Sequence, residues 1–219
     1  MTPLGWGLLA LAAVAAVIDW WAVWTATRRA RAVERVAKPA VVTALVGLAA
    51  VTPSAVQAVQ AWLVVALACS LAGDVLLLPP GRLVAGLVAF LVGHLAYTGA
   101  FAQLGGSTAW ALVGVGGAGL VATTVGRRLV RAAEGRRMGV PVTLYLLVIC
   151  LMAIAATRTG MPTAIVGAWL FVASDAMLGW GEFVVREQPA RDARRLRFGV
   201  IASYHVAQVL LVLALLFGS

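Results

Sequence analysis

Ser70-Leu71-Ala72-Gly73-Asp74 places a single carboxylate inside a run that is otherwise apolar over residues 61–78. A helix over this run is long enough to cross a bilayer, whose hydrocarbon core takes about 20 residues. An Asp at the membrane centre costs roughly 2.5–3.5 kcal/mol on insertion scales, so an acid there predicts a functional site. Phe171-Val172-Ala173-Ser174-Asp175 repeats this arrangement inside residues 161–181. The two acids are the centre of the interpretation that follows from the sequence.

The composition of the whole chain is typical of a membrane protein. Of the 219 residues, 63% are hydrophobic and 11% are charged, and the mean hydropathy is +0.99. Soluble domains contain about half apolar and about a quarter charged residues. The sequence lacks the period-two alternation of a transmembrane β-barrel. It therefore predicts an all-α, polytopic membrane helical bundle that forms a single integral membrane domain over residues 1–219.

Pro, Gly and Arg divide the chain into eight apolar segments. We predict a transmembrane helix over each of them: 3–26, 39–52, 60–78, 83–103, 108–126, 139–156, 161–181 and 197–217. The second segment is short, because 14 residues span about 21 Å at 1.5 Å per residue. Without it, Arg-rich loops would lie on opposite sides of the membrane, so eight helices are favoured over seven.

The basic residues predict the orientation of the helices. The net charge is +9, and all but one of the 17 Lys and Arg residues lie in the first, third, fifth and seventh predicted loops. They are Arg28, Arg29, Arg31, Arg35, Lys38, Arg82, Arg127, Arg128, Arg131, Arg136, Arg137, Arg186, Arg191, Arg194, Arg195 and Arg197. Under the positive-inside rule these loops are cytoplasmic and both termini are non-cytoplasmic. The charge thus indicates topology in a bacterial cytoplasmic membrane and gives no indication of a nucleic-acid partner.

With the helix directions set, the polar residues of the membrane fall in its cytoplasmic half. Asp74 lies four residues and Asp175 six residues from the inner ends of their helices. Lys38 and Tyr145 stand near the inner starts of theirs, and four further side chains lie nearer the middle: His94, Tyr204, His205 and Gln208. One water-accessible cavity that opens toward the inner leaflet would explain all of these residues.

Helical spacing groups several of these side chains on shared faces. One predicted stripe holds Gly86, Phe90, Gly93, His94 and Tyr97, and a second holds Gly167, Phe171, Ser174, Asp175 and Leu178. Ser70 and Asp74 are one turn apart, as are Tyr204 and Gln208. Glycines beside polar residues allow helices to approach closely, which favours a packed polar interior over lipid exposure.

Each candidate residue also has a purely structural explanation. The stripe glycines fit helix packing better than ligand contact, and His94 and His205 could be core histidines with satisfied hydrogen bonds. Asp19 stands near a helix end, where pairing with a loop Arg is favoured over catalysis. Asp74 and Asp175 could form buried ion pairs with Lys38 or an Arg.

An ordered set of motifs runs from about residue 38 to 210. Its members are Lys38-Pro39, Ser70-Leu71-Ala72-Gly73-Asp74, Gly86-Leu87, Phe90-Leu91-Val92-Gly93-His94, Tyr97, Pro141, Tyr145, Met152, Gly167-Ala168, Leu170-Phe171, Ser174-Asp175, Tyr204 and Ala207-Gln208. This set resembles the YhhN-type lysoplasmalogenase family of small eight-helix membrane proteins. His205 departs from the pattern, where an aromatic residue such as Tyr is expected.

The resemblance implies an ether hydrolase of membrane lipids. Family members of known activity cleave the vinyl ether bond of lysoplasmalogens, which are 1-alkenyl-glycerophosphoethanolamines or -cholines, into a fatty aldehyde and a glycerophospho-alcohol. It also implies that Asp74 and Asp175 are the catalytic acids, the residues that burial cost singles out independently. The expected partners are a lysophospholipid substrate and membrane lipids. No motif in the sequence predicts the headgroup preference or the oligomeric state.

Vinyl ether cleavage sets requirements that two carboxyl groups meet. A proton must reach the terminal alkene carbon, and water must attack the resulting oxocarbenium ion, as in glycoside hydrolysis. Two acids in one low-dielectric cavity do not both ionise cheaply, so one is expected to donate the proton while the other stabilises the cation. The expected supporting residues are Lys38, Ser70, His94, Tyr97, Tyr145, Ser174, Tyr204, His205 and Gln208, with Lys38 or a loop Arg holding the lipid phosphate. This chemistry requires neither a metal nor a cofactor.

The alternative is a proton-coupled transporter of a small molecule or lipid, in which the same acids form a relay. A possible internal repeat favours it, because Arg28-Arg29 recurs as Arg127-Arg128 and Asp74 as Asp175. Transporters usually contain broken helices at the membrane midplane, whereas no interior Pro interrupts the third, fourth, seventh or eighth predicted helix. A third class, a scaffold protein, would leave the two acids unexplained.

Overall fold

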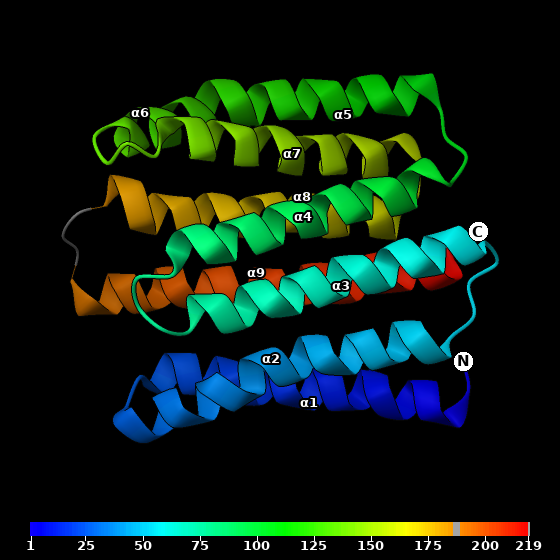
Figure 1. The fold of residues 1–219 in the computed structure, drawn as a ribbon, viewed down its shortest axis with the longest axis horizontal. Helices are drawn as coiled ribbons and strands as arrows, with labels where there is room; N and C mark the ends of the chain where they lie inside the picture. Colours follow the sequence, from blue (N-terminus) through cyan, green and yellow to red (C-terminus); the bar gives the residue numbers. More distant parts are fainter. Residues whose placement is uncertain (186–188, 219) are drawn as a thin grey trace.

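The computed structural model describes residues 1–185 and 189–218 and shows an all-α bundle (Figure 1). Its α-helices are α1 (Pro3–Thr25), α2 (Arg28–Val51), α3 (Gln57–Leu77), α4 (Leu83–Ala102), α5 (Thr108–Val121), α6 (Arg127–Glu134), α7 (Gly139–Arg158), α8 (Pro162–Gly179) and α9 (Ala190–Phe217). Two short π-helical segments, Ala122–Gly126 and Trp180–Val184, join α5 to α6 and extend α8. The described residues therefore form eight continuous helices.

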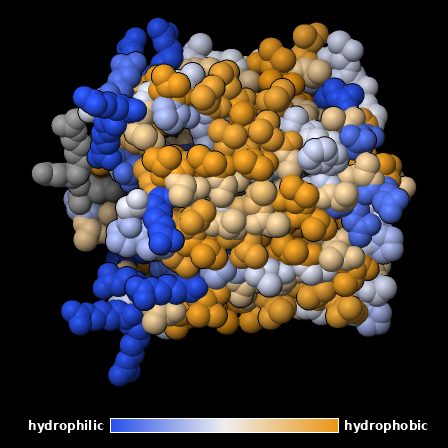
Figure 2. Space-filling model, in the orientation of Figure 1, coloured by the Kyte–Doolittle hydropathy of each residue, from blue (hydrophilic) through white to orange (hydrophobic). Residues whose placement is uncertain are grey.

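Seven of these helices are long and apolar enough to cross a membrane, so the chain is an integral membrane protein. Hydrophobic side chains cover the middle of the visible face, and hydrophilic side chains gather at the two ends of the bundle (Figure 2). The helix outside this set of seven is α2, because its first half carries Arg28, Arg29, Arg31, Glu34, Arg35 and Lys38. The all-α class is confirmed, and α2 is the helix that hydropathy alone does not place in the membrane.

Much of the Arg-rich sequence predicted as loop is helical. α2 begins at Arg28 instead of residue 39, with Pro39 inside it, and α9 begins at Ala190 instead of residue 197. α6 likewise continues α5 beyond the predicted end at residue 126. Thr27 caps α2 by accepting a hydrogen bond from the backbone N–H of Ala30 at 3.1 Å. Because Arg and Ala are strong helix formers, these helices continue past their apolar portions.

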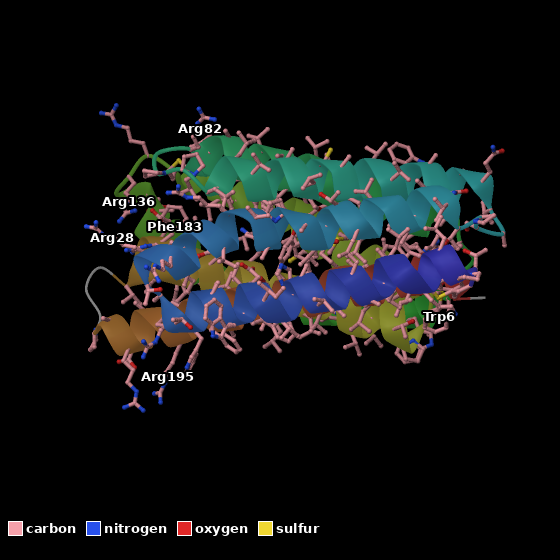
Figure 3. All side chains as sticks on the ribbon, turned by 90° about the horizontal axis from the view of Figure 1, so that it is seen from below. Trp6, Arg28, Arg82, Arg136, Phe183 and Arg195 are labelled. Atoms are coloured by element: carbon pink, nitrogen blue, oxygen red, sulfur yellow. The ribbon has the colours of Figure 1, made fainter. Side chains whose placement is uncertain are left out.

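The four loops predicted to share one side of the membrane do meet at one end of the bundle. Arg28, Arg82, Arg136 and Arg195 lie at that end, whereas Trp6 lies at the other (Figure 3). The start of α1 and the end of α9 both lie at the end away from these arginines (Figure 1). The assignment of the Arg-rich end to the cytoplasm stays a prediction. Arg186, also predicted in the seventh loop, is outside the described residues.

Helices that follow each other in sequence pack closely in pairs: α1 with α2, α3 with α4, and α8 with α9. A Cβ atom on Gly73 would lie 2.5 Å from the ring of Phe90, so α3 and α4 require glycine at this contact. A Cβ atom on Gly167 would lie 3.2 Å from the backbone nitrogen of Leu211, which agrees with a packing role for this glycine. These close approaches hold α3, α4, α8 and α9 around a polar interior.

Candidate active site

A cavity of about 710 Å³ lies at the Arg-rich end, walled by α2, α3, α4, α8 and α9. Asp74 from α3 and Asp175 from α8 both line it, together with Lys38, Ser174 and Tyr204. Leucine, valine, isoleucine and methionine side chains make up much of the remaining wall. The two acids that are far apart in sequence therefore face one space that has both polar and apolar surfaces.

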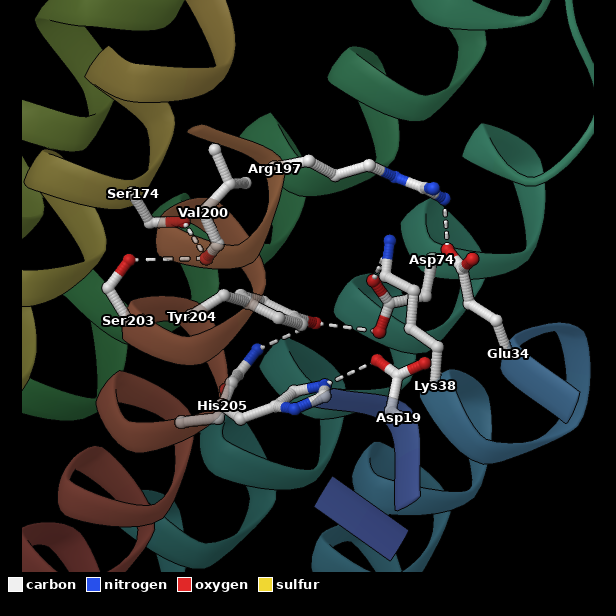
Figure 4. Close-up of polar contacts among 11 residues, drawn as sticks. Asp19, Glu34, Lys38, Asp74, Ser174, Arg197, Val200, Ser203, Tyr204 and His205 are labelled. Atoms are coloured by element: carbon white, nitrogen blue, oxygen red, sulfur yellow. Dashed lines mark hydrogen bonds and ion pairs between the residues drawn. The ribbon is translucent and has the colours of Figure 1, made fainter. Parts of the chain in front are cut away.

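Asp74 is fully buried and is held by two groups from other helices (Figure 4). Its Oδ1 atom forms an ion pair with Lys38 Nζ of α2 at 3.1 Å, and its Oδ2 accepts a hydrogen bond from the Tyr204 hydroxyl of α9 at 2.8 Å. A positive charge and a hydroxyl donor thus face the carboxylate. This arrangement stabilises its ionised form and offsets part of the cost of burying it.

Two further buried residues orient Tyr204. Gln208, one turn along α9, donates from Nε2 to the Tyr204 hydroxyl oxygen at 3.2 Å. The Tyr97 hydroxyl of α4 in turn donates to Gln208 Oε1. Because the phenol oxygen of Tyr204 accepts from Gln208, its own proton is directed to Asp74. The chain of hydrogen bonds from Tyr97 to Asp74 fixes one geometry across three helices.

Asp175 has different partners, supplied by α4 and α7. The Tyr145 hydroxyl donates to Asp175 Oδ2, and His94 Nε2 lies 3.2 Å from the same oxygen. His94 Nε2 and the Tyr145 hydroxyl are also 3.0 Å apart, so the three groups form a closed triangle. The side chain of Asp175 is 14% exposed, in contrast to that of Asp74 at 0%. Asp175 is therefore the acid with more direct access from the cavity.

An aromatic cluster connects the residues that hold the two acids. The Phe171 ring lies edge-on to both Tyr204, at 5.3 Å between centroids, and His94, at 4.7 Å. Phe90 packs edge-on against Tyr204 at 5.7 Å and lines the cavity. Since Tyr204 contacts Asp74 and His94 contacts Asp175, the cluster sets the relative positions of the acids. Phe90 and Phe171 lie on the two predicted helical stripes, but their positions in the sequence did not indicate a role in the site.

Three predicted supporting residues form no hydrogen bond with Asp74 or Asp175. Ser70 donates to the Ala66 carbonyl oxygen of its own helix at 2.9 Å and so does not contact Asp74 through that bond. Ser174 lines the cavity but donates to the Val200 carbonyl oxygen of α9 at 2.9 Å. His205 faces α1 instead of the cavity. Ser70 uses a backbone acceptor on its own helix and Ser174 uses one on α9, and spacing on a helical face indicates neither bond.

Asp19 and His205 form a second buried acid–imidazole pair. Asp19 Oδ2 lies 3.9 Å from His205 Nε2 (Figure 4). Trp20 stacks on His205 with 6.4 Å between ring centroids. Among the described residues, both carboxylate oxygens and both ring nitrogens have no hydrogen-bond partner. The expected pairing of Asp19 with a loop Arg is wrong, because the α1–α9 contact brings His205 to it.

The Asp19–His205 pair predicts energetic coupling between the two residues. Asp19→Val and His205→Phe alone are each expected to destabilise the protein by about 1–3 kcal/mol, because each replaces the polar group that faces the other buried side chain at 3.9 Å with an apolar one. The double variant should cost much less than the sum of the two. Thermal unfolding of the four proteins in detergent measures this cycle. Strictly additive effects would show that the two side chains do not interact.

No metal centre is indicated in the described portion of the chain, where three or more His, Cys, Asp or Glu side chains nowhere gather as ligands would. The sequence indicated Arg31, Arg35 and Arg197 as topology signals and left a phosphate-binding role to an unspecified loop Arg; all three line the cavity. For the first two, a signal was present: with Lys38 they are spaced at i, i+4 and i+7, which places them on one face of a helix. The expectation of a loop at residues 28–38 concealed it.

The part of the chain that matches known proteins includes most of the cavity and both of its acids. The model of the YhhN family matches residues 33–215. Lysoplasmalogenases of Mycobacterium bovis and Mycobacterium tuberculosis are each 33% identical over 167 residues. These alignments cover 72% of this chain and 61% of each relative, so the chain spans about three fifths of their length. No solved structure matches the chain significantly. Asp74 and Asp175 lie inside the matched residues, and Asp19 precedes them.

Proposed function

Because the chain belongs to the YhhN family, we propose that it is a membrane hydrolase that cleaves the vinyl ether bond of lysoplasmalogens. The observation that carries this proposal is the position of Asp74 and Asp175 on the wall of one cavity. That cavity combines apolar walls with a cationic rim, which suits a single-chain lipid with a charged head. The similarity to mycobacterial lysoplasmalogenases supports the same substrate class.

Asp175 is the proton donor in this proposal. Its contacts with His94 and Tyr145 both fall on Oδ2, which leaves Oδ1 for the substrate. The proton passes to the alkene carbon that does not carry the ether oxygen, forming a C–H bond and leaving an oxocarbenium ion at the carbon that does. The resulting carboxylate then accepts a proton from the water that attacks this carbon. Collapse of the hemiacetal breaks the bond to the glycerol oxygen, which takes the hydroxyl proton, so the enzyme returns to its starting state.

Asp74 is the partner that stabilises positive charge. Lys38 and Tyr204 hold it in place as a carboxylate before the substrate arrives, so no reorganisation is needed when the cation forms. The ring of Phe90 lines the same cavity and adds an aromatic surface that attracts a cation. The buried aromatic cluster behind it limits the water in contact with the acids, which strengthens these electrostatic interactions.

The proposed topology follows from the common position of the arginines. We place the Arg-rich end in the cytoplasm, with α2 as an eighth membrane helix and both termini outside. The cavity then opens toward the inner leaflet, where a lysophospholipid could enter with its headgroup near the surface. The whole chain forms one integral membrane domain in this proposal, without a cofactor.

Aldehyde release tests the proposed reaction. Purified protein in a maltoside detergent is expected to release fatty aldehyde from 1-alkenyl lysophospholipids, measured by coupled reduction with NADH and alcohol dehydrogenase. The matching 1-alkyl and 1-acyl lysolipids should yield none, because neither forms an oxocarbenium ion on protonation of an alkene. Folded protein that releases no aldehyde, but transports lysolipid into vesicles under a proton gradient, would instead establish the transporter alternative.

A further inference from the structure

The charged residues that line the cavity form pairs, with two exceptions among those described. Lys38 pairs with Asp74, and Arg197 of α9 pairs with buried Glu34 of α2. On the acidic side, Asp175 contacts His94, and Glu182 pairs with Arg136 at 2.9 Å. The cavity cations with no acid within ion-pair distance, over residues 1–185 and 189–218, are Arg31 and Arg35.

Arg31 and Arg35 occupy one face of α2 and are both exposed. They are one helical turn apart, and Lys38 follows three residues later on the same face. At 1.5 Å per residue, Arg35 precedes Lys38 by about 4.5 Å along the helix axis and Arg31 precedes it by about 10.5 Å. This face of α2 extends from the cavity rim to the Lys38 ammonium, which pairs with Asp74. Between the rim and Lys38 it carries the positive charges of Arg31 and Arg35, which have no acidic partner among the described residues.

We infer that Arg31 and Arg35 form the site for the phosphodiester of the lysolipid substrate. The inference rests on the proposed function, and it names the residues that select a phosphorylated headgroup. A guanidinium group presents several N–H donors in a plane that matches phosphate oxygens, and two such groups one turn apart can share one phosphodiester. Lys38 is already committed to Asp74, so it is not the phosphate ligand.

The length of the substrate agrees with this placement. A three-carbon glycerol separates the phosphate of a lysoplasmalogen from its vinyl ether, which corresponds to roughly 5–8 Å at ordinary covalent bond lengths. This span matches the axial distance of about 4.5–10.5 Å between the arginines and Lys38. A phosphodiester held at Arg31 and Arg35 would therefore leave the vinyl ether beside Asp74. The distance along α2 between the two arginines and Lys38 therefore positions the reacting bond at the depth of the acids.

A binding experiment with uncleavable ligands tests the site without relying on turnover. The probes are 1-O-hexadecyl-glycerophosphocholine and 1-O-hexadecylglycerol, which share the ether and the chain but differ in the phosphodiester. Binding is measured by intrinsic tryptophan fluorescence in a maltoside detergent, whose headgroup carries no phosphate. Arg31→Gln and Arg35→Gln are each expected to weaken binding of the phosphorylated probe about tenfold, while affinity for the alkylglycerol changes less than about twofold.

Arg29→Gln is the matched control. Arg29 is exposed like Arg31, and its substitution by Gln removes the same charge. It lies about 200° from Arg31 around the helix axis and does not line the cavity. Its variant should bind both probes as the unmodified protein does. Thermal unfolding of each variant, together with Arg35→Lys, shows whether a loss arises from misfolding, because the Lys variant keeps the charge and should retain part of the phosphate affinity.

Three results would overturn the inference. Equal effects of Arg29→Gln and the two cavity variants would show a general charge effect at the membrane surface. Equal weakening of both probes would show that the arginines support the cavity without contacting phosphate. Inorganic phosphate alone that binds as tightly as the phosphorylated probe would identify a free-anion site. If the expected binding differences are observed but the protein releases no aldehyde, the phosphate site is correct and the proposed hydrolysis is wrong.

Discussion

Asp175→Asn is expected to lower the rate of aldehyde release by about 10³-fold or more, while the protein stays folded. General acid catalysis contributes about 10²–10⁴-fold, and the same carboxylate acts as base in the second step. The amide keeps the shape of the side chain and can accept from Tyr145, so the contacts with α4 and α7 are conserved in form. The measurement is kcat for a 1-alkenyl lysophospholipid, with binding of the 1-alkyl analogue as a check on the cavity.

Asp192→Asn is the control for this substitution. Asp192 is an exposed acid on α9 that lies 3.9 Å from Arg195 and does not line the cavity. Its variant is expected to keep full activity. Asp175→Asn protein with more than about a tenth of the original kcat would remove Asp175 from the proton-transfer step, because a side chain that cannot donate a proton would still support the reaction.

Lys38→Met should both destabilise the protein and abolish most activity. The side chains of Lys38 and Asp74 are 10% and 0% exposed, so the substitution leaves a buried carboxylate without its cation. Removing one partner of a buried ion pair costs about 3–5 kcal/mol. Asp74→Asn alone should be destabilising for the reciprocal reason, since it leaves the Lys38 ammonium unpaired. Thermal unfolding in detergent measures the stability and aldehyde release measures the activity.

The double variant Lys38→Met with Asp74→Asn separates stability from chemistry. Both charges are gone, so most of the lost stability should return, and Tyr204 can still donate to the oxygen of the amide. Activity should remain about 10²–10³-fold below the original, which is the usual loss when one electrostatic stabiliser of a transition state is removed. Recovery of activity together with stability would show that the pair is structural and that Asp74 takes no part in the reaction.

The sequence was sufficient for the membrane character of the chain and for its two central acids. Apolar runs of about 20 residues have few alternatives to transmembrane helices, because backbone groups in lipid must be satisfied within the segment. A carboxylate inside such a run has a high free-energy cost of insertion, and this cost identified both acids as candidate functional residues. The alternation of Arg-rich and Arg-poor ends also predicted that Arg28, Arg82, Arg136 and Arg195 would meet at one end.

The extent of α2 was mispredicted for a reason that is equally physical. Pro39 and the charges before it favour a loop by local signals, yet Pro39 lies inside the helix, which begins at Arg28, eleven residues before the predicted start, with Thr27 as its cap. Packing of α2 against α1 and α3 compensates for the interrupted hydrogen bond at the proline. The same error concealed the face on which Arg31 and Arg35 lie.

The sequence offered Lys38 as a possible ion-pair partner of either acid, and the structure pairs it with Asp74. Nothing in the local spacing indicates the other partners: Tyr204 for Asp74, His94 and Tyr145 for Asp175, and His205 for Asp19. Composition and periodicity determined that there would be helices, where the acids would lie along them and which ends would be basic. The packing of α3, α4, α7, α8 and α9 decided which side chains share a cavity, because that depends on helix rotation and crossing, which arise only when several apolar faces are buried against each other at once.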